Sequence, residues 1–272
     1  KIMKISNLNK KVSKIAVVTG GAGLLGKQHC IALVEMGCTV IILEKNKFDQ
    51  KKIFSSFKQN EIIKNIHYFK TDIVKFNEVK KTSEKILKLF GEVDILINNA
   101  ANNPKINKKN FNNIENFDHI NWNKDLEVGL TGSLNCTLVF GQKMAKRKKG
   151  VILNIASDLS VIAPDQRIYN SNNKIKIAKP VSYSVVKSGL VGMTKYFSTY
   201  WHKEGIRVNA LSPGGIYNKQ DKKFVNKLKK LIPLNRMAKI DEYKGAVKFL
   251  CGDDSSYMTG QNIIIDGGRS VW

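Results

Sequence analysis

Short, nearly continuous apolar runs alternate along the chain with longer segments whose apolar residues recur at helical spacing. The apolar runs predict strands, because continuous hydrophobic segments are typical of strands buried on both faces of a parallel sheet. The predicted strands cover residues 15–18, 39–43, 66–69, 93–97, 151–155, 206–210 and 262–265. The predicted helices cover about 24–36, 76–90, 117–148 and 183–203, and two more precede the last strand.

This alternation predicts an α/β fold with a single doubly wound parallel sheet and helices on both faces. The length of 272 residues suits one buried core, and no linker or repeat interrupts the pattern, so 1–272 is expected to be one domain. Two irregular stretches stand out, at 102–116 and at about 160–180. Long ordered loops in compact domains are often functional, although a surface insertion is the plain alternative.

The chain has a formal net charge of +24, which in principle favours nucleic acid, an anionic membrane or a phosphorylated substrate. However, Lys, Asn and Ile are all abundant and share A/T-rich codons, and the lysines are scattered, which favours compositional drift. The clusters at 146–149 and 222–230 fall on a predicted helix end and an exposed helix, where cations are well solvated. No specific nucleic-acid binding is expected, and charge-driven binding stays as an alternative hypothesis.

The four cysteines, Cys30, Cys38, Cys136 and Cys251, are widely spaced and form no C-x-x-C pair. This spacing predicts neither a metal site nor a disulfide framework, and it fits the reducing cytoplasm. No apolar run reaches about 18 residues, so no membrane span is expected. The residues before Ile15 contain no apolar core typical of a signal peptide.

A glycine-rich turn follows the first predicted strand and opens the first predicted helix. Its sequence is Thr-Gly-Gly-Ala-Gly-Leu-Leu-Gly at 19–26, which includes Gly20, Gly23 and Gly26. Glycine permits the tight turn and lets the backbone approach a pyrophosphate at the helix N-terminus. The strand–turn–helix context predicts a dinucleotide site, and a glycine-rich turn without a ligand is the alternative.

Glu44 ends the second predicted strand. An acidic side chain there accepts hydrogen bonds from the adenosine ribose and repels a 2′-phosphate, so it favours NAD over NADP. The neighbouring Lys45 weakens this preference, because a cation attracts the phosphate.

Tyr183 and Lys187 lie four residues apart at the start of a predicted helix, so they share one helix face. A free tyrosine has a pKa of about 10, and a nearby cation lowers that value by favouring the phenolate. Such a tyrosine exchanges a proton with a substrate oxygen while hydride moves to or from a cofactor. Ser157 follows the fifth strand at the carboxyl edge, where open α/β sheets bind ligands; alone, it would be read as a helix cap.

These motifs together resemble the short-chain dehydrogenase/reductase family over nearly the whole chain. Further matching pieces are Asp72 in Thr-Asp-Ile, Asn-Asn-Ala-Ala at 98–101, the segment 209–216, and the closing Thr-Gly-Gln and Asp-Gly-Gly. The resemblance implies a Rossmann fold, Tyr183 as acid/base, Lys187 as ribose ligand, Ser157 as substrate ligand, and a homo-oligomer, either tetramer or dimer. The implied cofactor-binding residues are Gly20, Gly23, Leu25, Gly26, Glu44, Asp72, Ile73, Asn99, Ala100, Tyr183, Lys187, Pro213, Gly214 and Ile216.

The sequence departs from the family pattern at three points. Gly129 stands where the family has an asparagine of the proton relay, so relay function is in doubt while hydride transfer is not. The glycine spacing is that of nucleotide-sugar epimerases and dehydratases, although no extra substrate domain is expected after Lys187. The separation between Ser157 and Tyr183 is about a dozen residues longer than usual.

The inserted loop at about 160–180 must begin and end beside the catalytic groups, so it is expected to wall the substrate pocket. It contains Arg167, which suits a carboxylate or phosphate, and Tyr169; a surface arginine is the alternative for Arg167. The loop, Gly129 and the ending Gly-Arg-Ser-Val-Trp together resemble a subgroup of bacterial surface-sugar and flagellin-modification pathways, such as legionaminic acid synthesis.

The sequence therefore predicts an NAD(H)-dependent oxidoreductase that interconverts an alcohol and a ketone on a polar sugar derivative. A 3-oxoacyl-carrier-protein reductase is the rival within the enzyme class, and Glu44 argues against its usual NADP. A non-catalytic NAD-binding sensor is the rival outside it: Gly129 permits this interpretation, and the intact Ser157, Tyr183 and Lys187 speak against it.

Overall fold

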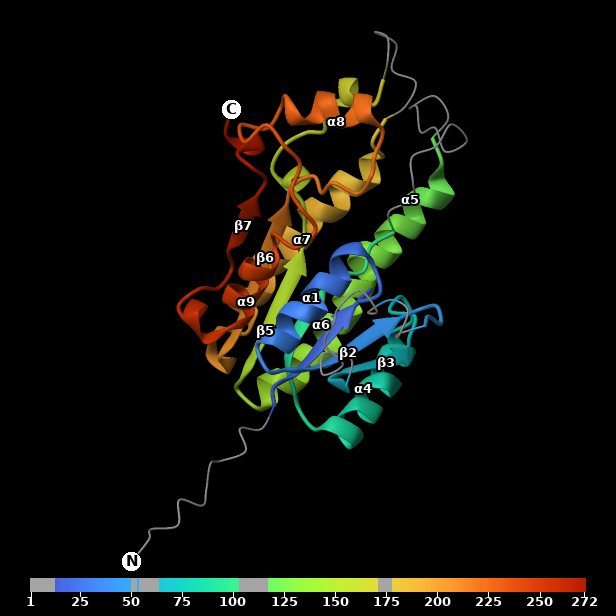
Figure 1. The fold of residues 1–272 in the computed structure, drawn as a ribbon. Helices are drawn as coiled ribbons and strands as arrows, with labels where there is room; N and C mark the ends of the chain where they lie inside the picture. Colours follow the sequence, from blue (N-terminus) through green and yellow to red (C-terminus); the bar gives the residue numbers. More distant parts are fainter. Residues whose placement is uncertain (1–12, 50–52, 54–63, 103–116, 171–177) are drawn as a thin grey trace, which may run out of the picture.

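The computed structural model describes residues 13–49, 53, 64–102, 117–170 and 178–272. Within these residues, seven parallel strands form one sheet in the order β3-β2-β1-β4-β5-β6-β7 (Figure 1). The strands are β1 (Ile15–Thr19), β2 (Thr39–Glu44), β3 (Ile66–Lys70), β4 (Val93–Asn98), β5 (Gly150–Ile155), β6 (Ile206–Pro213) and β7 (Asn262–Ile265). The doubly wound parallel sheet predicted from the sequence is thus confirmed.

The helices cover both faces of this sheet. They are α1 (Leu24–Glu35), α4 (Phe76–Phe90), α5 (His119–Leu126), α6 (Gly132–Lys146), α7 (Val181–Tyr200), α8 (Lys222–Lys229) and α9 (Lys244–Cys251). Alternate strand residues point to opposite faces. Accordingly, Val18 packs in one core cluster with α1 and α9, whereas Val17 packs in another with α4, α6 and α7.

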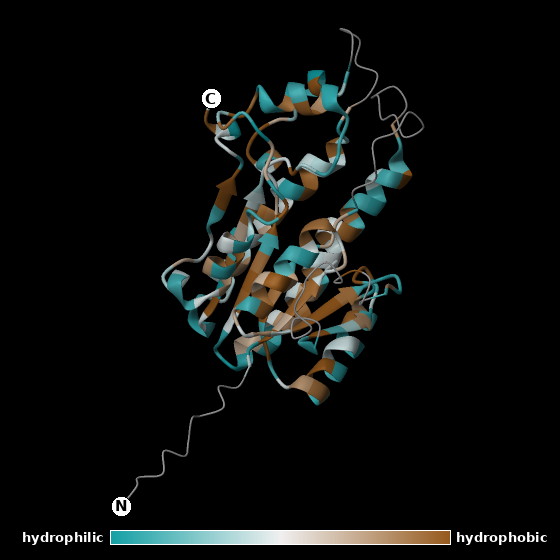
Figure 2. Cartoon of the chain, in the orientation of Figure 1, coloured by the Kyte–Doolittle hydropathy of each residue, from teal (hydrophilic) through white to brown (hydrophobic). Residues whose placement is uncertain are grey.

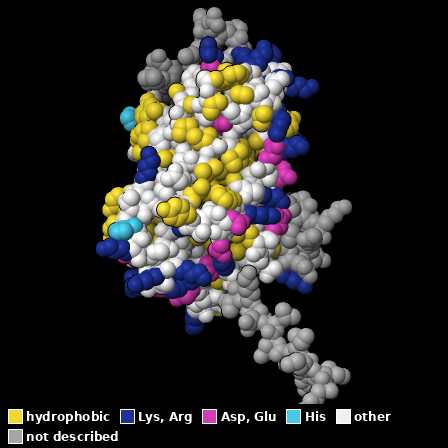
Figure 3. Space-filling view, turned by 90° about the vertical axis from the view of Figure 1, so that its left-hand side faces the viewer, with side chains coloured by type: hydrophobic (Ala, Val, Ile, Leu, Met, Phe, Trp, Pro, Cys, Tyr) yellow, Lys and Arg dark blue, Asp and Glu magenta, His cyan; other side chains and the backbone are white. Residues whose placement is uncertain are grey.

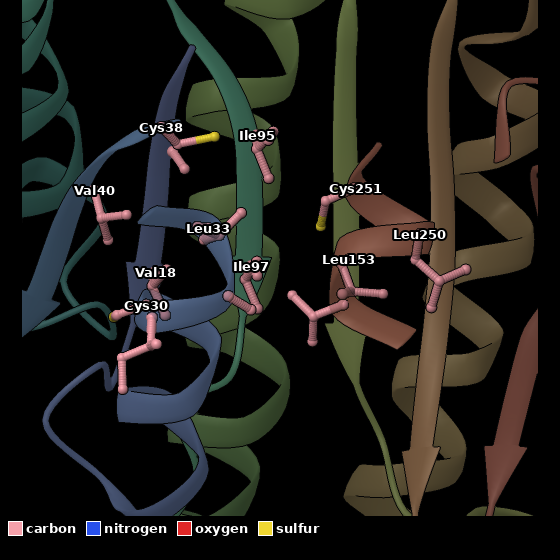
Figure 4. Packing of buried hydrophobic residues seen from close by; sticks show 14 of the residues in the cluster. Val18, Cys30, Leu33, Cys38, Val40, Ile95, Ile97, Leu153, Leu250 and Cys251 are labelled. Carbon is pink, nitrogen blue, oxygen red and sulfur yellow. The ribbon is translucent and has the colours of Figure 1, made fainter. Parts of the chain in front are cut away.

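Figure 4 shows the first of these clusters, where Leu33 of α1 and Leu250 of α9 approach Val18, Ile97 and Leu153 of the strands. The hydropathy colouring follows the same division, with apolar strands inside and polar residues on the outer helix faces (Figure 2). Burial of this apolar surface on both sides is the main force that holds the sheet together.

All four cysteines are free and buried. Burial raises the pKa of each thiol, to about 11 for Cys38 and to about 12 for Cys136 and Cys251. Among the described residues, no helix is long and apolar enough to cross a membrane.

The helix predicted at 117–148 is divided in the structure. A π-helical turn, η2 (Glu127–Thr131), joins α5 to α6, and Gly129 lies within it. A π turn holds one residue more than an α-helical turn and so rotates α6 about the helix axis; turns of this kind are frequent at functional sites. The apolar periodicity does not reveal such a local insertion, because the helix continues on both sides.

The strand order reverses beside β1, and crevices at such a switch point bind ligands in open α/β sheets. The glycine turn, Glu44, Asn98 and Ser157 all lie at or just past the carboxyl ends of β1, β2, β4 and β5, on the same edge. The sequence predicts two irregular stretches, at 102–116 and at about 160–180. Part of each, 103–116 and 171–177, lies outside the described residues.

Candidate active site

Ser157, Tyr183 and Lys187 come together at the carboxyl edge of the sheet. Ser157 caps the 3-10 turn η3 (Asp158–Ser160), and its Oγ accepts a hydrogen bond from the Leu159 N–H at 3.2 Å. A hydrogen bond also joins Ser157 to the side chain of Tyr183, in the first turn of α7. The cap that an isolated serine would suggest and the predicted catalytic position are therefore the same residue.

The Lys187 ammonium is fixed one helical turn below the tyrosine. It donates a hydrogen bond of 2.7 Å to the carbonyl of Ile155 and lies 5.7 Å from the centroid of the Tyr183 ring. Burial, reinforced by the charge of Lys179, lowers the pKa of Lys187 to about 8. The sequence-predicted Tyr-x-x-x-Lys geometry thus places a cation beside the phenol.

The pKa of Tyr183 is raised above its ordinary value. Burial is the main cause, and the negative charge of Asp158 acts in the same direction. The hydrogen bond to Ser157 opposes both, because it stabilises the phenolate. The net shift is therefore opposite to the lowering expected from a neighbouring cation, and the phenol is protonated at neutral pH.

A second lysine, which the sequence reasoning did not single out, contacts the same ring. The Lys179 ammonium lies 3.7 Å from the Tyr183 ring centroid, at the C-terminal end of the inserted loop. Burial lowers the pKa of Lys179 to about 8, while the charges of Asp125 and Asp158 act to raise it. Its place just before the helix that bears the tyrosine was the one available clue.

A narrow cavity beside the tyrosine is lined by Asp125, Gly129 and Lys187, among others. Asp125 is 8% exposed and accepts hydrogen bonds from the Ser182 hydroxyl and, at 2.8 Å, from the Asn102 amide. The sequence reasoning passed over this carboxylate. It lies one helical turn before Gly129, on the side of the helix that faces the cavity.

Gly129 itself is required by packing. A Cβ atom at this position would lie 2.3 Å from Cγ1 of Val186 in α7, far inside contact distance. The close approach of the two helices therefore excludes any larger residue here unless Val186 moves. The departure from the family pattern at Gly129 thus falls where Val186 leaves no room for a Cβ atom.

The two loop residues predicted to contact substrate have different environments. The Arg167 side chain is 86% exposed and binds Asp165 through Nη2 at 2.8 Å, so its described contacts are local. Tyr169 packs on Phe224 of α8 with 5.4 Å between ring centroids. Burial raises the pKa of Tyr169 to about 12, and the charges that act on it are those of Arg269, Tyr183 and Asp158.

The glycine turn is a tight turn with no room for side chains at two of its glycines. Gly20 has a φ of +64°, and a Cβ there would lie 2.9 Å from the Cα of Ala100. At Gly26, a Cβ would lie 2.2 Å from the Gly20 carbonyl. Gly23 is the N-cap of α1 and carries no side chain that could fill the space before the helix, and Leu25 packs on the adjoining core.

The segment after β4 is tied to this turn by hydrogen bonds. The Asn99 amide donates to the carbonyls of Thr19 and Gly20, each at 3.0 Å. The Thr19 hydroxyl accepts from the backbone N–H groups of Asn99 and Ala100, also at 3.0 Å. These four hydrogen bonds fix the glycine turn against the segment after β4.

The predicted acidic residues lie at the carboxyl ends of β2 and β3, and Glu44 contacts the glycine turn. The Glu44 carboxylate accepts hydrogen bonds from the backbone of Ala22 and Lys45, and burial raises its pKa. Lys45 forms an ion pair with Asp72 at 3.0 Å, and Ile73 is buried against Gly132. Lys45 is therefore engaged with a carboxylate of its own.

Pro213 ends β6, and the residues after it pass close to the last strand. The Gly214 N–H donates to the Ile265 carbonyl at 2.8 Å, and a Cβ at Gly214 would lie 2.7 Å from the Cα of Asp266. Ile216 pairs with Ala238 through an isolated bridge. One edge of the sheet thus carries the glycine turn, the acidic residues and the segment after Pro213. The residues present therefore fit a dinucleotide.

Comparison with known proteins identifies the family to which the chain belongs. A family model described as Enoyl-(Acyl carrier protein) reductase matches residues 22–270. A protein named NAD-dependent glycerol dehydrogenase from Listeria innocua is 31% identical over 263 residues, covering 95% of this chain and 94% of that protein. A 3-oxoacyl-acyl-carrier-protein reductase FabG from Buchnera aphidicola is 33% identical over 263 residues, covering 95% and 98%.

Among solved structures, a short-chain dehydrogenase from Leptospira borgpetersenii with bound NAD+ has a TM-score of 0.81 and 30% identity, covering 95% of this chain and 93% of that one. The chain belongs to the short-chain dehydrogenase/reductase family. It is an oxidoreductase of this family that acts on CH–OH groups with a nicotinamide dinucleotide, as the sequence predicts.

Proposed function

We propose that the protein interconverts an alcohol and a ketone on a polar small molecule, with NAD(H) as cofactor and Tyr183 as acid/base. The observation that carries the proposal is the meeting of Ser157, Tyr183 and Lys187 at the edge of the sheet that also carries the glycine turn. A non-catalytic NAD sensor would have no need of this assembly, so the enzyme is the better explanation.

In the reducing direction, Tyr183 donates its phenolic proton to the carbonyl oxygen of the substrate; in the oxidising direction, it accepts the alcohol proton. Lys187 stabilises the phenolate through its charge, and its bond to Ile155 keeps the ammonium in place. Ser157 positions the reacting oxygen next to the tyrosine. A nicotinamide bound at this edge of the sheet would supply or accept the hydride.

NAD is the proposed cofactor rather than NADP. Glu44 is held at the glycine turn by the backbone of Ala22, where its charge repels a 2′-phosphate. Lys45 weakens this effect less than the sequence suggests, because its ammonium is paired with Asp72. The relative named as NAD-dependent and the NAD+-bound neighbour support the same choice.

The proposed substrate is a sugar derivative with an anionic group. Lys179 places a cation over the Tyr183 ring, and a carboxylate or phosphate on the substrate would complement it. The glycerol dehydrogenase named among the relatives supports a polyhydroxy substrate, in line with the surface-sugar subgroup that the sequence resembles. A 3-oxoacyl-carrier-protein reductase is the second candidate, because a relative has that name.

We further infer that residues 1–272 form one domain, that the protein is a cytoplasmic homo-oligomer, and that it binds no specific nucleic acid. Exposed apolar side chains near the edge strand β7 support an oligomer, since such surfaces are usually covered. They include Leu234, Tyr257, Ile264 and Trp272. Figure 3 shows hydrophobic side chains gathered on this side of the molecule. Free buried thiols fit a reducing compartment.

The deciding experiment measures NAD+ reduction with polyols, uronic acids and sugar phosphates, and NADH oxidation with acetoacetyl-CoA. Wild type is compared with Tyr183→Phe, which keeps the ring and removes the proton. We expect turnover of an acidic sugar derivative that the variant loses by about a thousandfold, within the range of general acid–base catalysis. A variant as fast as wild type would refute the mechanism, and turnover of acetoacetyl-CoA alone would favour the second candidate.

A further inference from the structure

A buried ion pair connects the last helical turn of the described chain to the catalytic serine. Arg269, in the 3-10 turn η7 (Arg269–Val271), donates from Nη1 to Oδ2 of Asp158 at 2.7 Å, across 111 positions of sequence. The side chains of Arg269 and Asp158 are 8% and 4% exposed. Asp158 directly follows Ser157, whose Oγ donates to Asp158 Oδ1 at 2.8 Å.

The direction of these bonds has a chemical consequence. An ionised carboxylate only accepts hydrogen bonds, so the Ser157 hydroxyl must direct its proton toward Asp158. The Ser157 oxygen then presents its lone pairs to its other neighbours, one of which is the Leu159 N–H. This single proton is also the only one that Ser157 can donate to the Tyr183 phenolate or to a substrate carbonyl, so Asp158 competes with both for it.

We propose that Arg269 is a positioning residue for the reaction: through Asp158 it fixes the direction of the Ser157 hydroxyl and neutralises a carboxylate beside Tyr183. This inference rests on the proposed function, in which Tyr183 exchanges the proton. Arg269 touches no reacting atom itself; it acts through the aspartate and the serine.

The charge balance around Tyr183 explains why the arginine matters. The charged and titratable groups around the tyrosine are Asp158 from η3, Tyr169 from η4 (Gln166–Tyr169), and Lys179 and Lys187 from α7 and the residues just before it; Asp125 of α5 acts on Lys179. Asp158 opposes ionisation of the phenol. Inside the protein the negative charge of Asp158 is weakly screened. Only a nearby cation can therefore offset its effect on Tyr183.

The chain around Arg269 is built to hold the guanidinium in one place. The Asp266 carboxylate accepts hydrogen bonds from the N–H groups of Gly268 at 2.9 Å and Ser270 at 2.8 Å. Gly268 has a φ of +89°, a left-handed conformation that favours glycine. The Trp272 indole donates to the Leu231 carbonyl at 3.1 Å. Contacts on both sides of Arg269 thus fix its approach to Asp158.

A purely structural role for the pair is the competing explanation, and the two differ in what happens to Tyr183. An ion pair that only anchors the chain would change the free energy of unfolding without shifting the pKa of the Tyr183 phenol. A positioning and neutralising role predicts shifts of opposite sign when the cation and the anion are removed separately.

The test is the ionisation of Tyr183, read without substrate as the absorbance difference at alkaline pH between each protein and the same protein carrying Tyr183→Phe. We expect Asp158→Asn, which keeps the shape, to lower the apparent pKa of Tyr183 by about one unit, and Arg269→Met to raise it similarly. The double variant, which lacks both charges, should stay near wild type.

Arg147→Met is the matched control, because it removes an arginine paired at 3.0 Å with Asp94 at the start of β4, the opposite edge of the sheet. It should leave the Tyr183 titration unchanged. If Arg269→Met unfolds the protein, the apparent pKa of Tyr183 in Asp158→Asn still tests the inference. Shifts of the same sign in both variants, or none in Asp158→Asn, would overturn the inference. The readout needs no turnover, so it stays separate from a failure of Tyr183→Phe to lose activity.

Discussion

The Lys179 ammonium lies 3.7 Å above the centre of the Tyr183 ring, so the residue proposed to move the proton has a cation on its face as well as one along its helix. The first cation comes from the inserted loop and the second from the Tyr-x-x-x-Lys spacing. Cations over an aromatic face are attracted to it even when the phenol is neutral. The loop thus completes the immediate surroundings of the tyrosine.

Replacing Lys179 with Met should lower kcat/KM for a carboxylate- or phosphate-bearing substrate by about tenfold or more, the usual cost of losing a charge-assisted contact. A neutral polyol should lose much less. Because the pKa of Lys179 is lowered to about 8, the wild-type preference for the anionic substrate should fade as the pH rises through that value. Parallel pH profiles of both substrates measure this; equal losses for both would contradict an anion-binding role.

Replacing Glu44 with Ala should shift cofactor choice toward NADPH. The variant removes a carboxylate that repels the 2′-phosphate and accepts ribose hydrogen bonds, so NADH binding should weaken and NADPH binding should improve by about tenfold, equivalent to about 1.4 kcal/mol. Calorimetric titration of both nucleotides checks this. The Lys45→Met control removes the neighbouring cation instead and should disfavour NADPH.

Restoring the family asparagine as Gly129→Asn should destabilise the protein rather than improve it. The new Cβ would meet Val186 at 2.3 Å, and overpacking of this kind costs about 1–3 kcal/mol. Adding Val186→Ala should recover part of the loss, because it removes the clashing methyl groups. Urea denaturation of the two single variants and the double variant measures the coupling, and strictly additive losses would argue against the clash.

Stability should fall on acidification because of His29. This side chain is fully buried, neither ring nitrogen has a hydrogen-bond partner among the described residues, and burial lowers its pKa from 6.5 to about 4. The unfolded chain therefore binds the proton more tightly, and the histidine removes up to about 3 kcal/mol of stability as the pH falls from 6.5 toward 4.

The change His29→Leu should flatten this part of the stability–pH curve, while the exposed His202→Leu should leave it unchanged. Urea denaturation at several pH values between 4 and 7 is the measurement. An acid limb as steep in His29→Leu as in wild type would assign the loss to other groups.

The sequence predicted the sheet and the catalytic trio because both follow from local patterns. Apolar runs mark the strands, and residues that follow successive parallel strands meet at one edge, which brings Ser157 to Tyr183. The Arg269–Asp158 pair was beyond reach, because no local pattern tells which charges 111 positions apart will meet. The contact of Arg167 with Asp165, two residues away, was not predicted from the sequence, and its role as a ligand for an anion stays a prediction.

The burial of every cysteine has a practical consequence for labelling. With the thiolate disfavoured at all four positions, the folded protein should present no reactive sulfur to a maleimide dye. A cysteine introduced at an exposed position such as Ile120, which is 68% accessible in α5, would then be the single attachment point. Fluorescence measurements of movement next to the site can therefore start from the native chain, because no natural cysteine has to be removed.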